Sequence, residues 1–310
     1  MSICKQNLNI DVVRGLKLAD FSVTNSNYTF VADTFPNLRR ITIASLKLNN
    51  NSISHLLTSL TQLKTVNIEI APITGIAFEH VANRLRTLQW QVRNATDMNG
   101  FPYSQSITSF SLTVLTENSD LDFALQQVTE KMPNLRELFI NAKGVETFGS
   151  LKLNNLRSLS LQVNRLYDTT TINLQTVMKL KLTIQRHDFA FGKVFIQFQK
   201  LKIIEIKGAN MNVLSAALII ALQSVETLES FVLKEETESL FDYMYNMNGE
   251  TTNLLYELFE ALDFVEYFEV HVNCKDYSND QLAVLYAATK PLLVKQRFPY
   301  FRYVSVKYYE

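Results

Sequence analysis

The chain is poor in the residues that carry most covalent, metal and cofactor chemistry. Its 310 residues include 2 cysteines, 4 histidines, 8 glycines and 6 prolines. Cys4 and Cys274 lie far apart and provide no disulfide framework, so we expect reduced thiols. The sequence has no GxxxxGK[ST] or GxGxxG loop, no GxSxG turn and no HExxH motif. We therefore predict a non-catalytic protein with no cofactor and no metal.

An excess of one charge and a long apolar run are also missing. Thirty basic and thirty acidic residues cancel, so neither nucleic acid nor an anionic membrane is an expected partner. The longest apolar candidate, residues 213–222, is shorter than the about 20 residues of a membrane span. The opening MSICKQNLNIDVV lacks the basic flank and apolar run of a signal peptide. These features favour a cytoplasmic or nuclear protein.

What the sequence does contain is one six-residue pattern, apolar at its first, fourth and sixth positions, that occurs twelve times. The copies begin at Val13, Leu38, Leu63, Leu85, Ile107, Leu135, Leu156, Val177, Leu201, Leu228, Val265 and Phe301. Stacked copies of one unit share a continuous core, so we expect residues 1–310 to form a single solenoid domain. Residues 1–12 would be an N-terminal cap, and the long repeats of 265–310 would close the C-terminal end.

The second half of each copy alternates apolar and polar residues, which is typical of a short strand with one buried side. In the copy at Leu156, Leu159 and Leu161 should point inward, while Ser158 and Ser160 should point outward. We thus expect an α/β solenoid. About twelve parallel strands would form its concave face, with helices and turns on the convex face.

The spacing between copies, 21 to 37 residues, determines what can connect the strands. Apolar residues recur at helical spacing in the connections 53–63, 121–135, 213–220 and 254–262. Ser52 is the expected N-cap of the first of these helices. The units of 21 and 22 residues leave room only for turns or a single helical turn.

The repeated pattern resembles the leucine-rich repeat family over nearly the whole chain. The family consensus places Asn or Cys three residues after the pattern, whereas here only Asn164 and Asn273 stand there. The buried asparagine ladder of the family should therefore be mostly missing. Uneven repeats that contain helices are most similar to the repeat region of F-box leucine-rich-repeat proteins, although no F-box segment precedes Val13. The resemblance implies a protein-interaction scaffold, and specifically the substrate-recognition arm of an F-box-type ubiquitin ligase.

Two other functions fit the same repeats. The first is an extracellular recognition protein whose signal peptide has been removed, with the sequons at Asn27, Asn50 and Asn94 occupied by glycans. The second is a non-enzymatic regulator of a GTPase, which would need an exposed arginine at the concave rim, such as Arg14, Arg39 or Arg40.

The outward strand positions predict where a partner binds. They are mostly small and neutral in the first seven copies, and then become larger, charged or aromatic, as anchors of protein interfaces usually are. We predict a protein partner on the concave face of the second half. The predicted contact residues are Lys179, Lys181, Glu205, Lys207, Tyr267, Glu269, His271 and Tyr303. Alternatively, Tyr267 and Tyr303 cover neighbouring strands near the open edge of the sheet.

Formal charge is unevenly distributed along the chain. Residues 131–207 hold thirteen basic and five acidic residues, and residues 226–269 hold twelve acidic residues and one basic residue, Lys234. The acidic block either gives the binding surface two poles or belongs to solvated convex helices, and the second interpretation is favoured. The second position of the pattern is Arg or Lys in eight of twelve copies, which indicates the rim of the sheet rather than a ladder for nucleic acid.

Overall fold

The structure is a computed structural model in which two compact units, residues 1–142 and 143–310, are described separately. The described residues are 13–19, 26–116, 121–142, 151–163, 172–173, 175–184, 200–208, 216–235, 254–273, 279, 283 and 303–309. The predicted cap 1–12, both cysteines and Asn164 lie outside these ranges. That residues 1–310 form a single domain stays a prediction.

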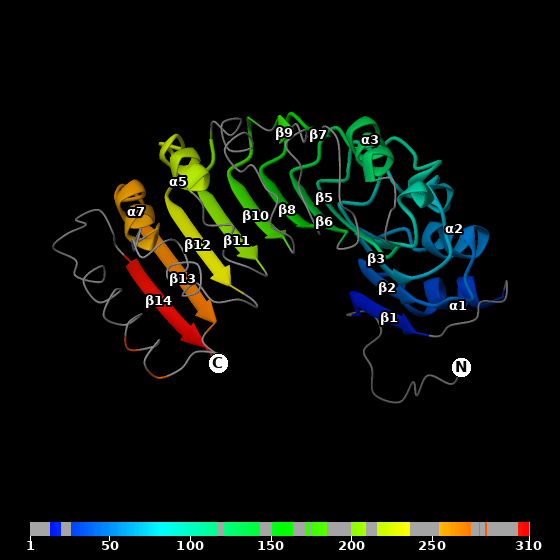
Figure 1. The fold of residues 1–310 in the computed structure, drawn as a ribbon. Helices are drawn as coiled ribbons and strands as arrows, with labels where there is room; N and C mark the ends of the chain where they lie inside the picture. Colours follow the sequence, from blue (N-terminus) through cyan, green and yellow to red (C-terminus); the bar gives the residue numbers. More distant parts are fainter. Residues whose placement is uncertain are drawn as a thin grey trace. The chain divides into compact units, whose positions relative to one another are not determined.

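Each unit is built on six parallel strands in chain order (Figure 1). In the first unit they are β1 (Gly15–Ala19), β2 (Arg40–Ala44), β3 (Thr65–Ile70), β4 (Thr87–Val92), β5 (Ser109–Val114) and β6 (Glu137–Ala142). In the second they are β8 (Ser158–Val163), β10 (Lys179–Ile184), β11 (Ile203–Gly208), β12 (Ser230–Glu235), β13 (Tyr267–Asn273) and β14 (Tyr303–Tyr309). Each of the twelve repeats contributes one strand, which confirms the predicted α/β leucine-rich-repeat solenoid. A short parallel pair, β7 (Leu151–Lys152) with β9 (Ile172–Asn173), was not predicted.

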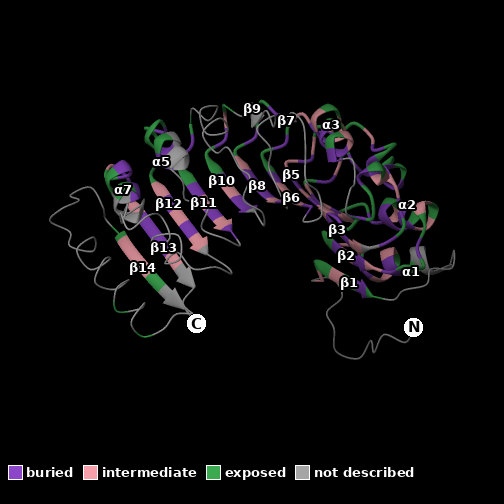
Figure 2. Ribbon diagram, in the orientation of Figure 1, coloured by how far each residue is buried: buried purple, intermediate pink, exposed green. Residues whose placement is uncertain are grey.

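Along each strand, every second side chain is buried in the core and the residues between them are more exposed (Figure 2). Leu159 and Leu161 are fully buried, while Ser158 and Ser160 are partly exposed on the opposite side, as predicted. The same alternation recurs in β2, β5, β6 and β11. Burial of branched apolar side chains on one side is the main stabilising contribution to each unit.

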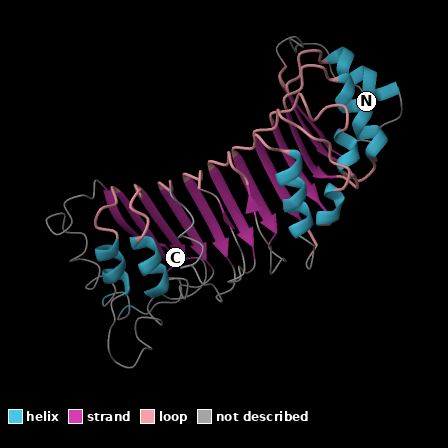
Figure 3. Ribbon diagram, turned by 90° about the horizontal axis from the view of Figure 1, so that it is seen from above, coloured by secondary structure: helices cyan, strands magenta, loops and turns pink. Residues whose placement is uncertain are grey.

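Helices fill the longer connections and lie on one side of the strands within each unit (Figure 3). They are α1 (Ser26–Thr34), α2 (Asn50–Ser59), α3 (Leu121–Lys131), α5 (Ala216–Gln223) and α7 (Leu254–Ala261). Four of them match the predicted helical connections, whereas α1 was not predicted. Two 22-residue units carry the single 3₁₀ turns expected for them, η2 (Gly75–Phe78) and η3 (Ala95–Met98).

The predicted N-cap of α2 was wrong. Ser52 lies within the first turn of the helix, and its backbone N–H donates to Oδ1 of Asn49 at 2.9 Å. Asn49 is therefore the cap, because its side chain satisfies a backbone donor that has no partner inside the helix.

Backbone hydrogen bonds at the second position of the pattern join consecutive repeats. The carbonyl oxygen of Arg14 accepts from the N–H groups of Arg39 and Arg40, at 3.0 and 2.9 Å. The carbonyl oxygen of Arg157 accepts likewise from Met178 and Lys179, at 2.8 and 3.0 Å. The backbone is paired at this position while the side chains of Arg39 and Arg157 stay exposed, in agreement with a place at the rim.

Threonine hydroxyls link consecutive repeats, at a position other than that of the asparagine ladder. Leu46, which replaces the expected Asn in its repeat, is 60% exposed, and Asn273 is the last residue of β13. Thr227 Oγ1 donates to the carbonyl of Leu201 at 2.8 Å, and Thr176 makes the same bond one repeat apart. These bonds satisfy backbone carbonyls at the first position of the pattern, just before the strands begin.

A tight turn in the first unit sits beside its aromatic core. Trp90 packs against Phe78, with ring centroids 5.0 Å apart, and Phe101 lies 5.5 Å from Phe78. At Gly75 an added Cβ would lie 2.3 Å from the backbone nitrogen of Phe101 and 2.7 Å from the carbonyl oxygen of Met98. The close approach of two backbone segments therefore requires glycine here.

We predict that Gly75→Ala destabilises the first unit by about 1–3 kcal/mol, because the added methyl group forces backbone to move. Urea unfolding followed by circular dichroism measures the change. Gly15→Ala is the matched control, since its Cβ would meet Arg40 Cβ at an ordinary 4.0 Å, and it should change stability by less than about 1 kcal/mol. Equal stability of the two variants would show that the turn can relax without cost.

Candidate functional site

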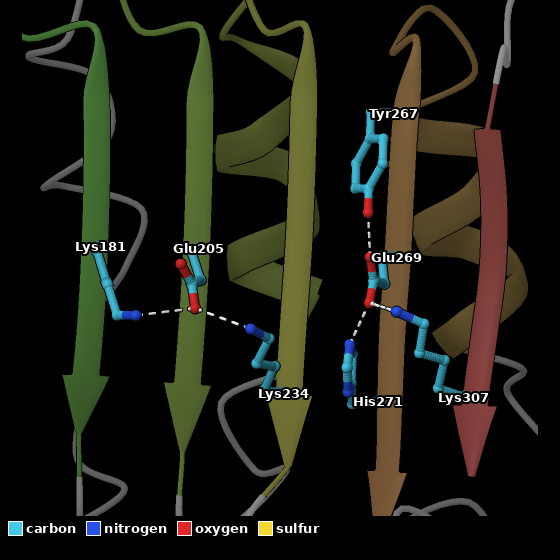
Figure 4. A network of polar contacts seen from close by, with 7 residues as sticks. All are labelled: Lys181, Glu205, Lys234, Tyr267, Glu269, His271 and Lys307. Carbon is cyan, nitrogen blue, oxygen red and sulfur yellow. Dashed lines mark hydrogen bonds and ion pairs between the residues drawn. The ribbon is translucent and has the colours of Figure 1, made fainter.

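All eight predicted contact residues lie on one side of strands β10 to β14. The helices α5 and α7 pack behind these strands, and the polar side chains stand in front (Figure 4). We call the side of each sheet away from its helices the open face. Each predicted residue occupies an outward position of its strand, so the strand pattern placed it correctly.

Strand register arranges the open face of β10–β14 in three rows that run across the strands. Row one contains Lys179, Ile203, Ser230, Tyr267 and Tyr303. Row two contains Lys181, Glu205, Val232, Glu269 and Ser305. Row three contains Thr183, Lys207, Lys234, His271 and Lys307.

The first polar cluster is centred on Glu205. Lys181 Nζ lies 3.0 Å and Lys234 Nζ 3.1 Å from the same oxygen, Oε1 of Glu205. The Glu205 side chain is 17% exposed, and its burial favours the neutral acid. Hydrogen bonds from Lys181 and Lys234 outweigh that burial and lower the pKa of Glu205. The cluster holds two ammonium groups on one carboxylate and therefore carries a net positive charge.

The second polar cluster is centred on Glu269, which is 5% exposed. Its Oε1 accepts hydrogen bonds from Lys307 Nζ and His271 Nε2, and its Oε2 accepts from the hydroxyl of Tyr267 (Figure 4). Burial opposes ionisation, but the three donors, led by Lys307, lower the pKa of Glu269 to about 2. Glu269 is therefore a charged group held inside a ring of donors.

The carboxylate of Glu269 raises the pKa values of two of its hydrogen-bond donors, Tyr267 and Lys307. The hydrogen bond to its carboxylate raises the pKa of Tyr267 to about 12, because loss of the phenolic proton would place two negative charges together. The same carboxylate raises the pKa of Lys307. Both groups thus stay protonated near neutral pH and keep donating to Glu269.

Tyr267 and Tyr303 form a stacked pair at the last two strands. Their ring centroids lie 4.6 Å apart at an interplanar angle of 9°. The stack agrees with the alternative that these tyrosines cover neighbouring strands. Tyr303 is nevertheless 39% exposed, so the pair also offers aromatic surface to a partner.

Two residues of the clusters were missed by the sequence analysis. Lys234 was noted only as the one basic residue of the acidic block, and Lys307 was not singled out. Both occupy the third outward position of their strands, in register with His271 between them. Aligning that third position across repeats, as well as the first two, would have found both.

The open face of the second unit has an excess of positive charge. Among the described outward positions of β8 and β10–β14 there are five lysines and two glutamates, which sum to a net charge of +3 with neutral histidine. The lysines are Lys179, Lys181, Lys207, Lys234 and Lys307, and the glutamates are Glu205 and Glu269. At the outward positions of the first unit, Lys17 and Arg40 are balanced by Glu69 and Glu137. The open faces of the two units therefore differ in net charge at their described outward positions.

Four described carboxylates of the acidic block lie on a helix and in a turn rather than on this face. Glu257 and Glu260 are exposed on helix α7, and Asp263 and Glu266 are exposed in the turn before β13. Within the described residues these carboxylates therefore belong to helix and turn surfaces, which is the interpretation that the sequence favoured. Glu236, Glu238, Asp242 and Glu250 lie outside the described residues.

The described residues form neither a metal site nor a membrane-spanning helix. Across the described ranges, no group of three His, Cys, Asp or Glu side chains is placed to hold a metal ion. Among the same residues, no helix is both long enough and apolar enough to cross a membrane.

The repeated pattern and the order of the parallel strands define the fold class as a leucine-rich-repeat solenoid. No family model matches the sequence, and no curated protein matches it. A chain in the crystal structure of a TLR13–ssRNA13 complex is similar over 83% of this chain, at 12% identity and a TM-score of 0.30. This chain covers 54% of that one, or about half its length. The assignment of the fold rests on the repeats and the strand order.

We predict that the Glu269 cluster makes the stability of the second unit depend on acid. A carboxylate whose pKa falls from 4.5 to about 2 on folding stabilises the fold fully above about pH 4.5, and this contribution is lost as pH falls toward 2. The wild type should lose up to about 3 kcal/mol more than Glu269→Gln between pH 6 and pH 2. Urea unfolding at several pH values measures this difference.

The control for this prediction is Glu229→Gln. Glu229 pairs with Lys202 at the rim, and its side chain is 55% exposed, so its charge is screened by solvent. This variant should keep the pH dependence of the wild type. Parallel pH profiles for wild type and Glu269→Gln would contradict the role assigned to Glu269.

Proposed function

We propose that the chain is a protein-recognition scaffold that binds an acidic region of a partner protein on the open face of its second unit. The net charge of +3 at the described outward positions of that face, compared with zero in the first unit, is the observation that carries the proposal. Positive potential of this kind speeds the encounter with an acidic surface and opposes basic competitors. Repeat scaffolds of this kind generally bind rather than catalyse, and we propose the same here.

The two clusters support the proposal because they fix charged side chains before a partner arrives. Lys181, Lys234 and Lys307 are each held by a carboxylate within the face. A fixed side chain loses less conformational freedom on binding than a mobile one, which saves about 0.5–1.5 kcal/mol for each side chain. Tyr267 and Tyr303 add rigid aromatic surface next to these charges.

The finer role that we propose is the substrate-recognition arm of an F-box-type ubiquitin ligase. It rests on the similarity of these uneven, helix-containing repeats to the repeat region of that family. The acidic region would then belong to the substrate selected for ubiquitination.

The extracellular alternative is less well supported. At the sequon of Asn50, the side-chain nitrogen that a glycan would occupy donates to Thr74 Oγ1 at 3.0 Å. Asn50 Oδ1 also accepts from the backbone N–H of Thr74 at 2.8 Å. These bonds tie α2 to the next repeat, and they weigh against a glycan on this side chain.

We predict that Lys179→Glu combined with Lys181→Glu lowers capture of the partner at least about tenfold, because two attractive charges become repulsive. Affinity capture from the source cell with quantitative mass spectrometry measures the loss. Lys179→Glu alone should act in the same direction, and Lys179 is exposed, so this single change leaves the Glu205 cluster intact.

Arg40→Glu is the matched control. Arg40 is exposed at the same repeat position as Lys179, but it lies on the first unit. Capture should persist in this variant. If Lys179→Glu and the double variant capture as much partner as Arg40→Glu does, the second unit does not provide the acidic-partner site.

The F-box role predicts that the same capture recovers core subunits of a ubiquitin ligase together with an acidic substrate. The ligase subunits should remain bound to the Lys179→Glu, Lys181→Glu variant, while the substrate is lost. Absence of ligase subunits from captures made with the full-length protein would reject this role and leave the acidic-partner proposal standing.

A further inference from the structure

The open face of β11–β14 separates its apolar and charged groups into bands that run across the strands. Row one presents Ile203, Tyr267 and Tyr303, with Ser230 between the first two, and Ile203 and Tyr303 are 37% and 39% exposed. Row three presents three lysines and His271 on four neighbouring strands. A partner that crosses the strands therefore meets apolar surface along one side and cations along the other.

Row two, between these bands, is the least exposed. Glu269 is 5% exposed and Glu205 17% exposed by its side chain, and both carboxylates point toward donors within the face. Val232 and Ser305 in the same row are short and partly buried. The middle of the face is therefore lined by small or inward-held side chains, and the partner's contacts fall on rows one and three.

The spacing of the basic side chains in row three favours one conformation of the partner. Neighbouring strands lie about 4.8 Å apart, so the four groups of row three span about 14 Å. Three turns of an α-helix advance about 16 Å, whereas side chains on one side of an extended chain recur every 6.8 Å and three repeats advance about 20 Å. Flexible lysine side chains can make up the difference of about 2 Å from a helix more easily than the difference of about 6 Å from an extended chain.

The width of the face agrees with the same conformation. Rows one and three are four residues apart along each strand, or about 13 Å. An α-helix with its side chains is about 10–12 Å across, so side chains on its two flanks reach both rows at once. An extended segment crossing the strands is narrower and would leave one row without contact.

We propose that the occupant of this face is an amphipathic α-helix of the partner protein, lying across β11–β14 with an acidic stripe on row three and an apolar stripe on row one. This inference rests on the proposed function and specifies the acidic region that is bound. Charge complementarity supplies the attraction, and the apolar side chains of row one determine which side of the helix faces that row.

The test uses three synthetic peptides of about 16 residues, long enough to cross four strands as a helix. The first carries Glu at helical spacing on one stripe and Leu on the adjoining stripe, with a side-chain lactam that keeps the short helix formed. The second has the same composition and lactam, with Glu and Leu mixed on all sides. The third replaces each Glu of the first by Gln. Binding to the wild-type chain is measured by fluorescence anisotropy at low and at physiological salt.

The striped peptide should bind at least about tenfold more tightly than either of the others, and its affinity should fall as salt rises. Lys234→Glu and Tyr303→Ala, one change in each band, should both weaken it, while Arg40→Glu on the first unit should not. The peptide changes test the same contacts without altering the protein, so the result stands even if the Lys234 variant does not fold.

Equal binding of the striped and mixed peptides would overturn the helix and leave recognition of acidic protein intact. Failure of all three peptides, with partner capture still sensitive to Lys179→Glu, would also overturn the helix alone. If capture is insensitive to Lys179→Glu as well, the proposed function fails together with this inference.

Discussion

The pair of backbone hydrogen bonds accepted at the second position of the repeats is the constraint on which the open face depends. Within each unit, carbonyls at this position accept from two N–H groups of the next repeat, as Lys202 does from Glu229 and Ser230 at 2.8 and 2.9 Å. These bonds set the register at the start of each strand. Since side chains alternate along a strand, a slip of one residue would turn every outward group into the core. The three rows of the second unit therefore exist because the backbone fixes where each strand begins.

Fixed register also creates an electrostatic cost, which the two clusters offset. Neighbouring cations of row three stand directly opposite one another, an arrangement that normally destabilises a sheet. Glu205 and Glu269 lie one row away from these cations. Glu205 accepts hydrogen bonds from Lys181 and Lys234 on the two adjacent strands. Glu269 accepts from Lys307 on the adjacent strand, and from His271 and Tyr267 on its own strand. The carboxylates neutralise part of the row and hold its side chains in place. The face keeps a net positive charge at its described outward positions, and this charge is what an acidic partner would meet.

The sequence predicted most of the fold, because a period-two pattern and a core of branched apolar residues leave few other arrangements. It also placed all eight outward residues on their strands. It missed Lys234 and Lys307, because only alignment of neighbouring strands shows that they meet Glu205 and Glu269. The cap at Asn49 was missed because Ser52 and Asn49 are both good capping residues, and the backbone hydrogen bond decides between them. The charge of the acidic block could not be assigned to one side of the sheet without the positions of α7 and the turns.

The single tryptophan of the chain, Trp90, is 1% exposed in the aromatic core of the first unit. Its indole fluorescence consequently reports the environment of that unit alone, while the second unit contains tyrosine but no tryptophan. Denaturation followed at the tryptophan emission wavelength and by a backbone signal can thus be compared within one sample. Coincident transitions would mean that the two units unfold cooperatively, and separate transitions would mean that each has its own stability. The placement of one aromatic residue makes the energetic coupling between the repeats a measurable quantity.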